Sequence, residues 1–509
     1  SSACCSCTAS TATSSTGDGA GVRLLYYNWV DPYDAEGRGG GVSLYQRTLL
    51  ETIAGQAGVE AAFLSAGLAH GVRAGAPRWE RVRSGAGPGR VRRFRMVDSR
   101  PLSPSHHSFG TPEQVTHPPT EEAFARFVEE EGPFDVLHFN NLEGLPAGVL
   151  AQCRRWAATR VVVSLHNFYP FCPQVNLWRQ ERAHCADYEG GAACRDCLPF
   201  RPEPAQVRRG HAAVRVLEGV GLAPGSAGYV HVAGPALRGA ARAVRRVATR
   251  RRTGPPAGAA PAVGSAEDFA ARRKAFIDAL NAHADRVLAV SERTAEIARD
   301  FGVAPGLLEV VRIGTDQSGH WQTRPAPRGL PRADGTLGLG YLGYMRRDKG
   351  FYFLLDALER MAPEILARLR LTIAAQARDA GSRARLSALA PRLAGFRHVD
   401  GYARDALDDI LAEVDLGLVP VLWEDTAPQV ALEMHARRIP LLTSDRGGAR
   451  ELGAFPGLVV PAGDAAALEA KLREILDTGL DLGPYWAGAL PPTSPEAHVG
   501  ALLDLYRTL

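Results

Sequence analysis

The sequence predicts two doubly wound, Rossmann-like α/β domains that face each other across a cleft. Short apolar runs, typical of buried parallel strands, alternate with amphipathic helical segments along most of the chain. Residues 314–335 are rich in Pro and Gly and poor in apolar residues, and they divide this pattern into two halves. Doubly wound sheets bind ligands at the carboxyl ends of their strands. A ligand site between the two halves is therefore expected.

The first domain is predicted over residues 21–315, after a Ser/Thr/Ala/Cys segment at 1–20 that is predicted to be disordered. A strand at Val22–Tyr27, a glycine loop and a helix over 42–54 open a βαβ unit. The further strands are expected at 59–64, 92–97, 135–139, 160–165, 286–290 and 308–312, and the helices at 120–131, 145–156 and 291–301. Two insertions interrupt the alternation: a cysteine-containing segment at 166–200, and a mostly helical one at 203–283 with a Gly/Pro/Ala linker.

The second domain is predicted over residues 336–490, and a closing helix over 491–509 follows it. Its strands are expected at 337–342, 370–374, 416–421, 440–443 and 457–460, and its helices near 351–361, 405–414, 428–437 and 464–477. The closing helix covers Pro495–Thr508. Each strand–helix alternation again predicts a parallel sheet with helices on its faces.

Composition narrows the class of protein. With 45% apolar and 22% charged residues, the chain has ordinary globular composition, and its net charge of +4 gives no reason to expect a nucleic-acid partner. No run approaches the ~20 apolar residues of a membrane span, and the first residues carry no basic-then-apolar signal pattern. A cytoplasmic protein with reduced cysteines is therefore expected.

The second half contains three motifs: GYLGYMRRDKG at 340–350, WEDTAPQVALE at 423–433 and DRGGARE at 445–451. Together they resemble motifs of the retaining family-4 glycosyltransferases of the GT-B fold. The resemblance extends to roughly residues 22–65 and 134–167. It implies an enzyme that transfers a hexosyl group, with retention, from a nucleotide-sugar donor to a glycan, glycolipid or small-molecule acceptor, as in polysaccharide biosynthesis.

Cations at a helix start are expected to bind the donor diphosphate. Arg346, Arg347 and Lys349 lie in the loop where cations, backbone amides and the helix dipole can meet a phosphate. One departure from the family pattern is Tyr344, which stands where the family has an arginine.

The resemblance assigns the donor carboxylates. It implies that Glu433 binds the ribose, and that Asp425, eight residues before it, contacts the donor sugar as a catalytic residue beside Lys349. Glu424 is one residue out of that register and is kept as a donor-binding candidate.

Candidates in the first half come from a loop and a strand end. Gly40 and Gly41 allow a backbone to approach a phosphate at a helix N-terminus. His166 directly follows a predicted strand, and the resemblance implies a catalytic histidine near the donor sugar or phosphate.

The cysteine-containing segment predicts a structural metal. Cys172, Cys185, Cys194 and Cys197 fall within a short loop and close with a Cys-x2-Cys pair, which suits tetrahedral zinc. Unpaired thiols or redox pairing are the alternatives. No catalytic metal is expected, because cations and helix ends can hold the diphosphate.

An arginine-rich segment predicts a contact with a membrane. Residues 237–252 contain seven arginines and no acidic residue, with small apolar residues on the adjacent helical face. This pattern suits an anionic membrane surface and a lipid-linked acceptor, so the enzyme would lie peripherally at the inner face; a solvated basic helix is the alternative. For the whole chain, the alternatives are a non-catalytic GT-B scaffold with a zinc-ordered loop, or a sugar-nucleotide epimerase or phosphorylase of the same fold.

Overall fold

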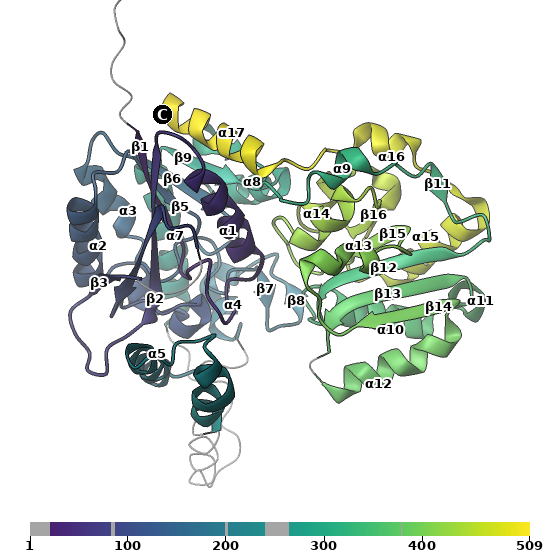
Figure 1. The fold of residues 1–509 in the computed structure, drawn as a ribbon, viewed down its shortest axis with the longest axis horizontal. Helices are drawn as coiled ribbons and strands as arrows, with labels where there is room; N and C mark the ends of the chain where they lie inside the picture. The colour runs from purple at the N-terminus through teal and green to yellow at the C-terminus, as the bar shows by residue number, and fades with distance from the viewer. Residues whose placement is uncertain (1–20, 83–86, 199–201, 240–263, 378) are drawn as a thin grey trace, which may run out of the picture.

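Two β-sheets, one in each half of the chain, organise the fold (Figure 1). The computed structural model describes residues 21–82, 87–198, 202–239, 264–377 and 379–509. The first sheet has eight strands in the order β10-β9-β6-β5-β1-β2-β4-β3, all parallel except for the antiparallel β3–β4 pair. These strands are β1 (Val22–Tyr27), β2 (Val59–Ala69), β3 (Arg78–Arg81), β4 (Val91–Val97), β5 (Val136–Phe139), β6 (Arg160–Leu165), β9 (Arg286–Ala289) and β10 (Leu308–Val310).

Alternate residues of this sheet enter two different cores. Leu25 and Tyr27 of β1 pack in one core with α2 (Pro118–Glu131), α3 (Val149–Gln152) and α7 (Ala266–His283). Leu24 and Tyr26 pack in the other core with α1 (Gly40–Ala54) and α17 (Pro495–Thr508). Because successive side chains of a strand point to opposite faces, helices cover both faces, as the doubly wound prediction requires.

The second sheet has six parallel strands in the order β14-β13-β12-β15-β16-β17. Its strands are β12 (Leu337–Tyr344), β13 (Leu369–Gln376), β14 (Gly395–Val399), β15 (Leu416–Val419), β16 (Leu441–Ser444) and β17 (Val459–Val460). One face packs on α10 (Phe351–Arg360), α12 (Ala380–Leu389) and α15 (Ala465–Thr478), and the other on α13 (Leu407–Ile410) and α14 (Gln429–Ala436). The predicted fold class, two doubly wound α/β halves, is confirmed.

The remaining strands and α-helices lie outside the two main sheets and the helices named above. They are β7 (Trp178–Arg179), β8 (Ala183–His184), β11 (Gly329–Leu330), β18 (Leu480–Asp481), α4 (Ala192–Arg195), α5 (Pro204–Gly219), α8 (Glu292–Asp300), α9 (His320–Thr323), α11 (Pro363–Leu366) and α16 (Gly483–Gly488). Within the described residues, no helix combines the length and apolarity that a membrane crossing needs.

Some sequence predictions differ from the structure. The helix predicted at 145–156 is the short α3 followed by a 3-10 turn at Cys153–Arg155, and the helix predicted at 405–414 shrinks to α13. The strands β3 and β14 and the helix α12 were not predicted from the sequence. Edge strand β14 is half-buried with an arginine and a histidine, so its sequence lacks the apolar run that marks central strands.

The chain crosses between the halves twice. It passes from the first half to the second after β10 and returns before α17, which lies on the first half beside α1 (Figure 1). The amide of Thr315 donates to the carbonyl of Thr493 over 2.9 Å and ties the two crossing segments together. The last residues of the chain therefore complete the first half, against which the site is built.

Candidate functional site

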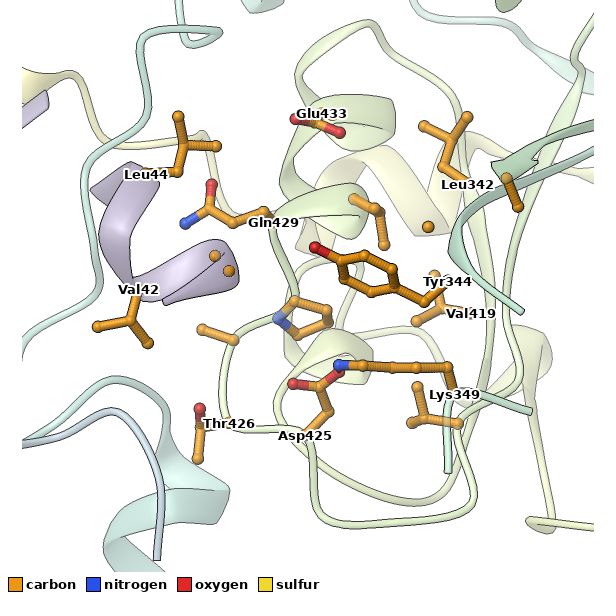
Figure 2. Close-up of a pocket in the computed structure, with 18 of the residues that line it drawn as sticks. Val42, Leu44, Leu342, Tyr344, Lys349, Val419, Asp425, Thr426, Gln429 and Glu433 are labelled. Carbon is orange, nitrogen blue, oxygen red and sulfur yellow. The ribbon is translucent and has the colours of Figure 1, made fainter. Parts of the chain in front are cut away.

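A cavity of about 620 Å³ lies between the two halves. Its walls come from the start of α1, the end of β6, the loop after β12 and the start of α14 (Figure 2). Figure 2 shows Lys349 and Asp425 meeting on one side of Tyr344 and Glu433 on the other. The cavity is thus at the carboxyl ends of strands from both sheets, where doubly wound folds bind ligands.

The N-terminus of α1 forms the wall from the first half. Gly40 and Gly41 both line the cavity, and Gly40 has φ +55°, a conformation that favours glycine. A Cβ on Gly41 would lie 3.1 Å from Cγ of Gln429 in the facing helix α14, so the close approach of the two halves needs a glycine there. The first amides of a helix lack intrahelical partners and favour anions. The structure therefore places both predicted glycines at the cavity wall, at the N-terminus of a helix.

Lys349 is the cation of the loop after β12 that reaches the cavity. Its Nζ donates to Oδ2 of Asp425 over 2.6 Å and lies 4.8 Å from the ring centroid of Trp423. The next residue, Gly350, has φ +75° and caps the N-terminus of α10, where a Cβ would collide with the carbonyl of Pro420. Lys349 is thus held at a helix start within reach of a ligand.

The two neighbouring arginines do not line the cavity, and their contact with the diphosphate stays a prediction. Arg346 forms a bidentate pair with the buried Asp348, and Arg347 packs against the ring of Tyr352. Two residues apart on a tight turn, Arg346 and Asp348 satisfy each other locally. Tyr344 lines the cavity instead, with its side chain 48% exposed.

Glu424 also lies outside the cavity, and its assignment to donor binding stays a prediction. It is 1% exposed and accepts hydrogen bonds from Nη2 and Nε of Arg293, at 2.9 and 3.1 Å. The amide of Gly447 donates to it over 2.8 Å. Burial alone would raise its pKa, but the Arg293 guanidinium and the Gly447 amide hold the pKa of Glu424 below its usual value. Glu424 therefore ties α8 of the first half to the second half.

Residues 447–451, the Gly-Gly-Ala-Arg-Glu part of the 445–451 motif, position the loop that carries Asp425, a role that was not predicted. The amide of Gly448 donates to the carbonyl of Asp425 over 2.9 Å, and a Cβ on Gly447 would collide with the Asp425 backbone. Glu451 accepts the amides of Glu292 and Arg293, at 2.9 and 2.8 Å, at the start of α8. The motif thus holds Asp425 in the cavity and joins the two halves.

Glu433 projects from α14 into the far end of the cavity. Its Oε1 accepts from Nε of Arg404 over 3.0 Å, and Oε2 lies 3.5 Å from the hydroxyl of Tyr402. Burial raises the pKa of Glu433, and Arg404 opposes that shift. Arg404 also donates to Asp316 over 2.7 Å. Neither Arg404 nor Tyr402 was predicted, because only the tertiary structure brings their loop against α14.

His166 follows β6 and lines the cavity from the first half. Its Nε2 lies 3.1 Å from Oδ1 of Asn140, and its ring centroid is 4.7 Å from that of Tyr45. Burial, with a smaller contribution from His498, lowers the pKa of His166 to about 3, so the imidazole is neutral at pH 7. The hydroxyl of Thr426 donates to the His166 carbonyl over 2.9 Å. The loop of Asp425 is thereby tied to this histidine.

The four cysteines of the 166–200 insertion are free thiols. Burial, followed by the neighbouring Cys172 thiol, raises the pKa of Cys194 and of Cys197 to about 12. Sγ of Cys197 donates to Oε1 of Gln174 over 2.8 Å. Among the residues that the structure describes, no three His, Cys, Asp or Glu side chains are arranged to hold a metal ion. The zinc site at Cys172, Cys185, Cys194 and Cys197 stays a prediction.

The segment 1–20, predicted to be disordered, lies outside the described residues. So does most of the arginine-rich segment that is predicted to contact a membrane, because residues 240–263 are not described.

Part of the chain matches a known protein family. Residues 336–478 match the family model described as Glycosyl transferases group 1. This match covers all the strands of the second sheet, with Lys349, Asp425 and Glu433. No curated protein matches the chain.

Solved structures resemble the whole chain. Sucrose-phosphate synthase from Thermosynechococcus elongatus is 16% identical, with a TM-score of 0.52 over 96% of this chain and 98% of that one. An alpha,alpha-trehalose-phosphate synthase (UDP-forming) from Burkholderia vietnamiensis is 12% identical, with a TM-score of 0.51 over 96% and 100%. Anabaena Alr3699/HepE, solved with UDP and glucose, is 13% identical, with a TM-score of 0.50 over 96% and 100%. These likenesses show that the chain has the two-domain GT-B fold.

Proposed function

We propose that the chain is a retaining glycosyltransferase that moves a hexosyl group from a nucleotide-sugar donor to an acceptor. One observation carries this proposal: a cavity between two GT-B halves brings Lys349, Asp425, Glu433 and the N-terminus of α1 together. Each of these groups matches one part of a nucleotide sugar. The match of residues 336–478 to Glycosyl transferases group 1 supports the same reaction class.

The donor lies along the cavity, with its ribose at Glu433 and its diphosphate at Lys349 and the start of α1. Glu433 accepts hydrogen bonds from the ribose hydroxyls, while Lys349 and the first amides of α1 neutralise the diphosphate. Asp425 and the neutral His166 contact the hexose between them. A cation and a helix N-terminus meet the charge that develops on the leaving diphosphate, so the residues themselves hold it without requiring a metal.

Retention follows from attack on the face that the diphosphate leaves. The acceptor oxygen forms a bond to the anomeric carbon as the bond from that carbon to the diphosphate oxygen breaks. The acceptor proton passes to the departing diphosphate oxygen, which balances the reaction. Asp425 is paired with Lys349 and accordingly acts in orientation and charge rather than as a covalent nucleophile.

A donor screen tests this function. Release of the nucleotide diphosphate is measured with UDP-, GDP-, ADP- and dTDP-sugars, after thermal-shift ranking of the four nucleotides. UDP is expected first, because the solved Anabaena protein binds UDP with glucose. An epimerase interconverts the sugars without net release, a phosphorylase requires inorganic phosphate, and a scaffold releases nothing from any donor.

The acceptor is proposed to be a glycan, a lipid-linked sugar or a small molecule, reached at an anionic membrane surface on the cytoplasmic side. The helical insertion supports a surface contact. Of the six exposed large apolar side chains in the described chain, four lie in it: Val216, Val220, Val230 and Val232. They precede the arginine-rich segment in the sequence, and apolar side chains beside basic ones suit a peripheral membrane contact.

A further inference from the structure

The C-terminal helix α17 carries buried polar side chains into the first half. His498 is 3% exposed and Tyr506 is 6% exposed. Tyr506 belongs to the core that α17 shares with α1, and His498 contacts Tyr45 of that core. A polar side chain inside an apolar contact is costly unless it is hydrogen-bonded. The hydrogen-bond partners of these two side chains therefore indicate what the side chains do.

His498 reaches the cavity through one intermediate. Its Nε2 lies 2.9 Å from the hydroxyl of Tyr45 in α1. The Tyr45 ring in turn packs on the imidazole of His166, with 4.7 Å between centroids and 42° between planes. Tyr45 and His166 line the cavity, whereas His498 does not. The contacts therefore form a chain from α17 to the candidate catalytic histidine.

A hydrogen bond to the side-chain amide of Asn140 holds the other side of the His166 ring. Oδ1 of Asn140 can only accept, so the Nε2 of His166 at 3.1 Å carries the hydrogen and Nδ1 is left as an acceptor. One hydrogen bond still permits the ring to tilt about that contact. The Tyr45 ring blocks this motion, provided that its own hydroxyl is anchored.

A second chain of contacts from α17 ends on β6, the strand that precedes His166. The Tyr506 hydroxyl lies 2.5 Å from Nδ1 of His138, and Nε2 of His138 lies 2.7 Å from the hydroxyl of Ser164. Ser164 belongs to β6, two residues before His166. Both buried polar groups of α17 thus support the strand end that presents the histidine.

The position of His498 is also sterically defined. A Cβ on Gly314, in the segment that crosses to the second half, would lie 2.9 Å from Cβ of His498. The glycine lets α17 approach the crossing segment closely at this residue. Small shifts of the helix would therefore be transmitted to the imidazole.

We infer that His498 is a positioning residue, which acts through the hydroxyl of Tyr45 to hold the imidazole of His166 against the donor site. This inference rests on the proposed function, since it assumes that His166 contacts the donor. A misplaced group near the reacting atoms lowers turnover more than ground-state binding.

A double-mutant cycle tests the contact chain. His498→Leu keeps the bulk of the side chain and removes its nitrogen, and Tyr45→Phe removes only the hydroxyl. Each is expected to lower kcat about 10-fold and leave the donor KM within about twofold. The double variant is expected to lose no more than either single variant, because both remove one interaction. His498→Gln, which retains a polar group, is expected to rescue most of the activity.

Arg507→Ala is the matched control. Arg507 lies on the same helix with its side chain 62% exposed, and it is expected to leave kcat unchanged. Fully additive losses in the double variant, or a wild-type kcat in folded His498→Leu, would overturn the inference.

A readout that needs no substrate separates this inference from the proposed function. With 15N-labelled histidine, His166 of the native chain is expected to give the signals of one tautomer with hydrogen on Nε2. Its resonances are identified by their loss in His166→Gln. Tyr45→Phe and His498→Leu are expected to shift or broaden these signals, whereas Arg507→Ala leaves them in place; unchanged signals in both would reject positioning. A chain that binds none of the four nucleotides and releases none from their sugars would contradict the proposed function, and the imidazole signals would still decide the positioning role.

Discussion

Nζ of Lys349 donates to Oδ2 of Asp425 across 2.6 Å, from the loop after β12 to the loop before α14. The pair joins the group proposed to neutralise the diphosphate to the group proposed to contact the sugar. Each charge of the pair stabilises the other, and a phosphate would attract the same ammonium. Donor binding and the orientation of Asp425 are therefore linked through one lysine.

Lys349→Ala is expected to lower transfer by about 100-fold, the scale of removing one charge partner of a transition state. Initial rates of nucleotide-diphosphate release measure the loss. Lys471→Ala provides the control, because Lys471 pairs with Glu474 on α15 away from the cavity. Near-normal turnover in folded Lys349→Ala would refute the diphosphate assignment.

Glu433→Gln is expected to weaken binding of the bare nucleotide diphosphate by about 10-fold, since hydrogen bonds to a charged group contribute about 1.5–3 kcal/mol. Isothermal titration calorimetry measures the affinity. Glu474→Gln, an exposed glutamate of α15, should bind the nucleotide like the native chain. Equal affinities for all three proteins would argue against ribose contact.

Elemental analysis of protein purified without added metal is expected to find about one zinc per chain, held by the four cysteines of the insertion. Cys194→Ser should lose the metal, whereas Cys153→Ser, at a buried cysteine outside the insertion, should retain it. Chelation is expected to expose residues 166–200 to protease while nucleotide affinity survives. Zinc-free protein with four freely titrating thiols would reject the site.

Stability is expected to fall as the pH drops below about 6.5, the ordinary pKa of histidine. Burial lowers the pKa of His138 and of His166 to about 3, and that of His435 to about 4. These side chains stay neutral when folded but take up protons when unfolded, so the stability present above pH 6.5 is lost as the pH falls. Each contributes up to about 1.4 kcal/mol per pH unit.

Urea denaturation at pH 7.5, 6.5 and 5.5 measures this dependence. His435→Gln should flatten the decline in the free energy of unfolding, and exposed His231→Gln should leave its slope as in the native chain. A free energy of unfolding that does not change between pH 5.5 and 7.5 would contradict the prediction that these buried histidines stay neutral in the folded chain.

Replacing Val216, Val220, Val230 and Val232 with serine is expected to reduce co-sedimentation with anionic vesicles by about 10-fold, because apolar contact and charge act together at a membrane surface. Vesicles of neutral phosphatidylcholine should bind weakly in all cases. Val72→Ser is the control, since Val72 is 77% exposed but lies outside the helical insertion. Undiminished binding to anionic vesicles would exclude these valines from the contact.

Periodicity and motif spacing determined much of the fold before any contact was known. Strands such as Val22–Tyr27 and Arg160–Leu165 are mainly apolar or β-branched, and their buried parallel pairing follows from that composition. Lys349, Asp425 and Glu433 were also predicted, because a helix start and a fixed spacing along one loop and helix are local properties of the chain.

Only the tertiary structure decided which charges face the cavity. Arg346 and Glu424 have the right chemistry for a donor site, but Asp348 and Arg293 pair with them elsewhere. Arg404 and His498 come from distant segments, and their contacts with Glu433 and Tyr45 depend on how the halves and α17 pack. A sequence pattern specifies which groups a segment offers, whereas the partner that satisfies each buried charge is settled when the two sheets and their crossing segments come together.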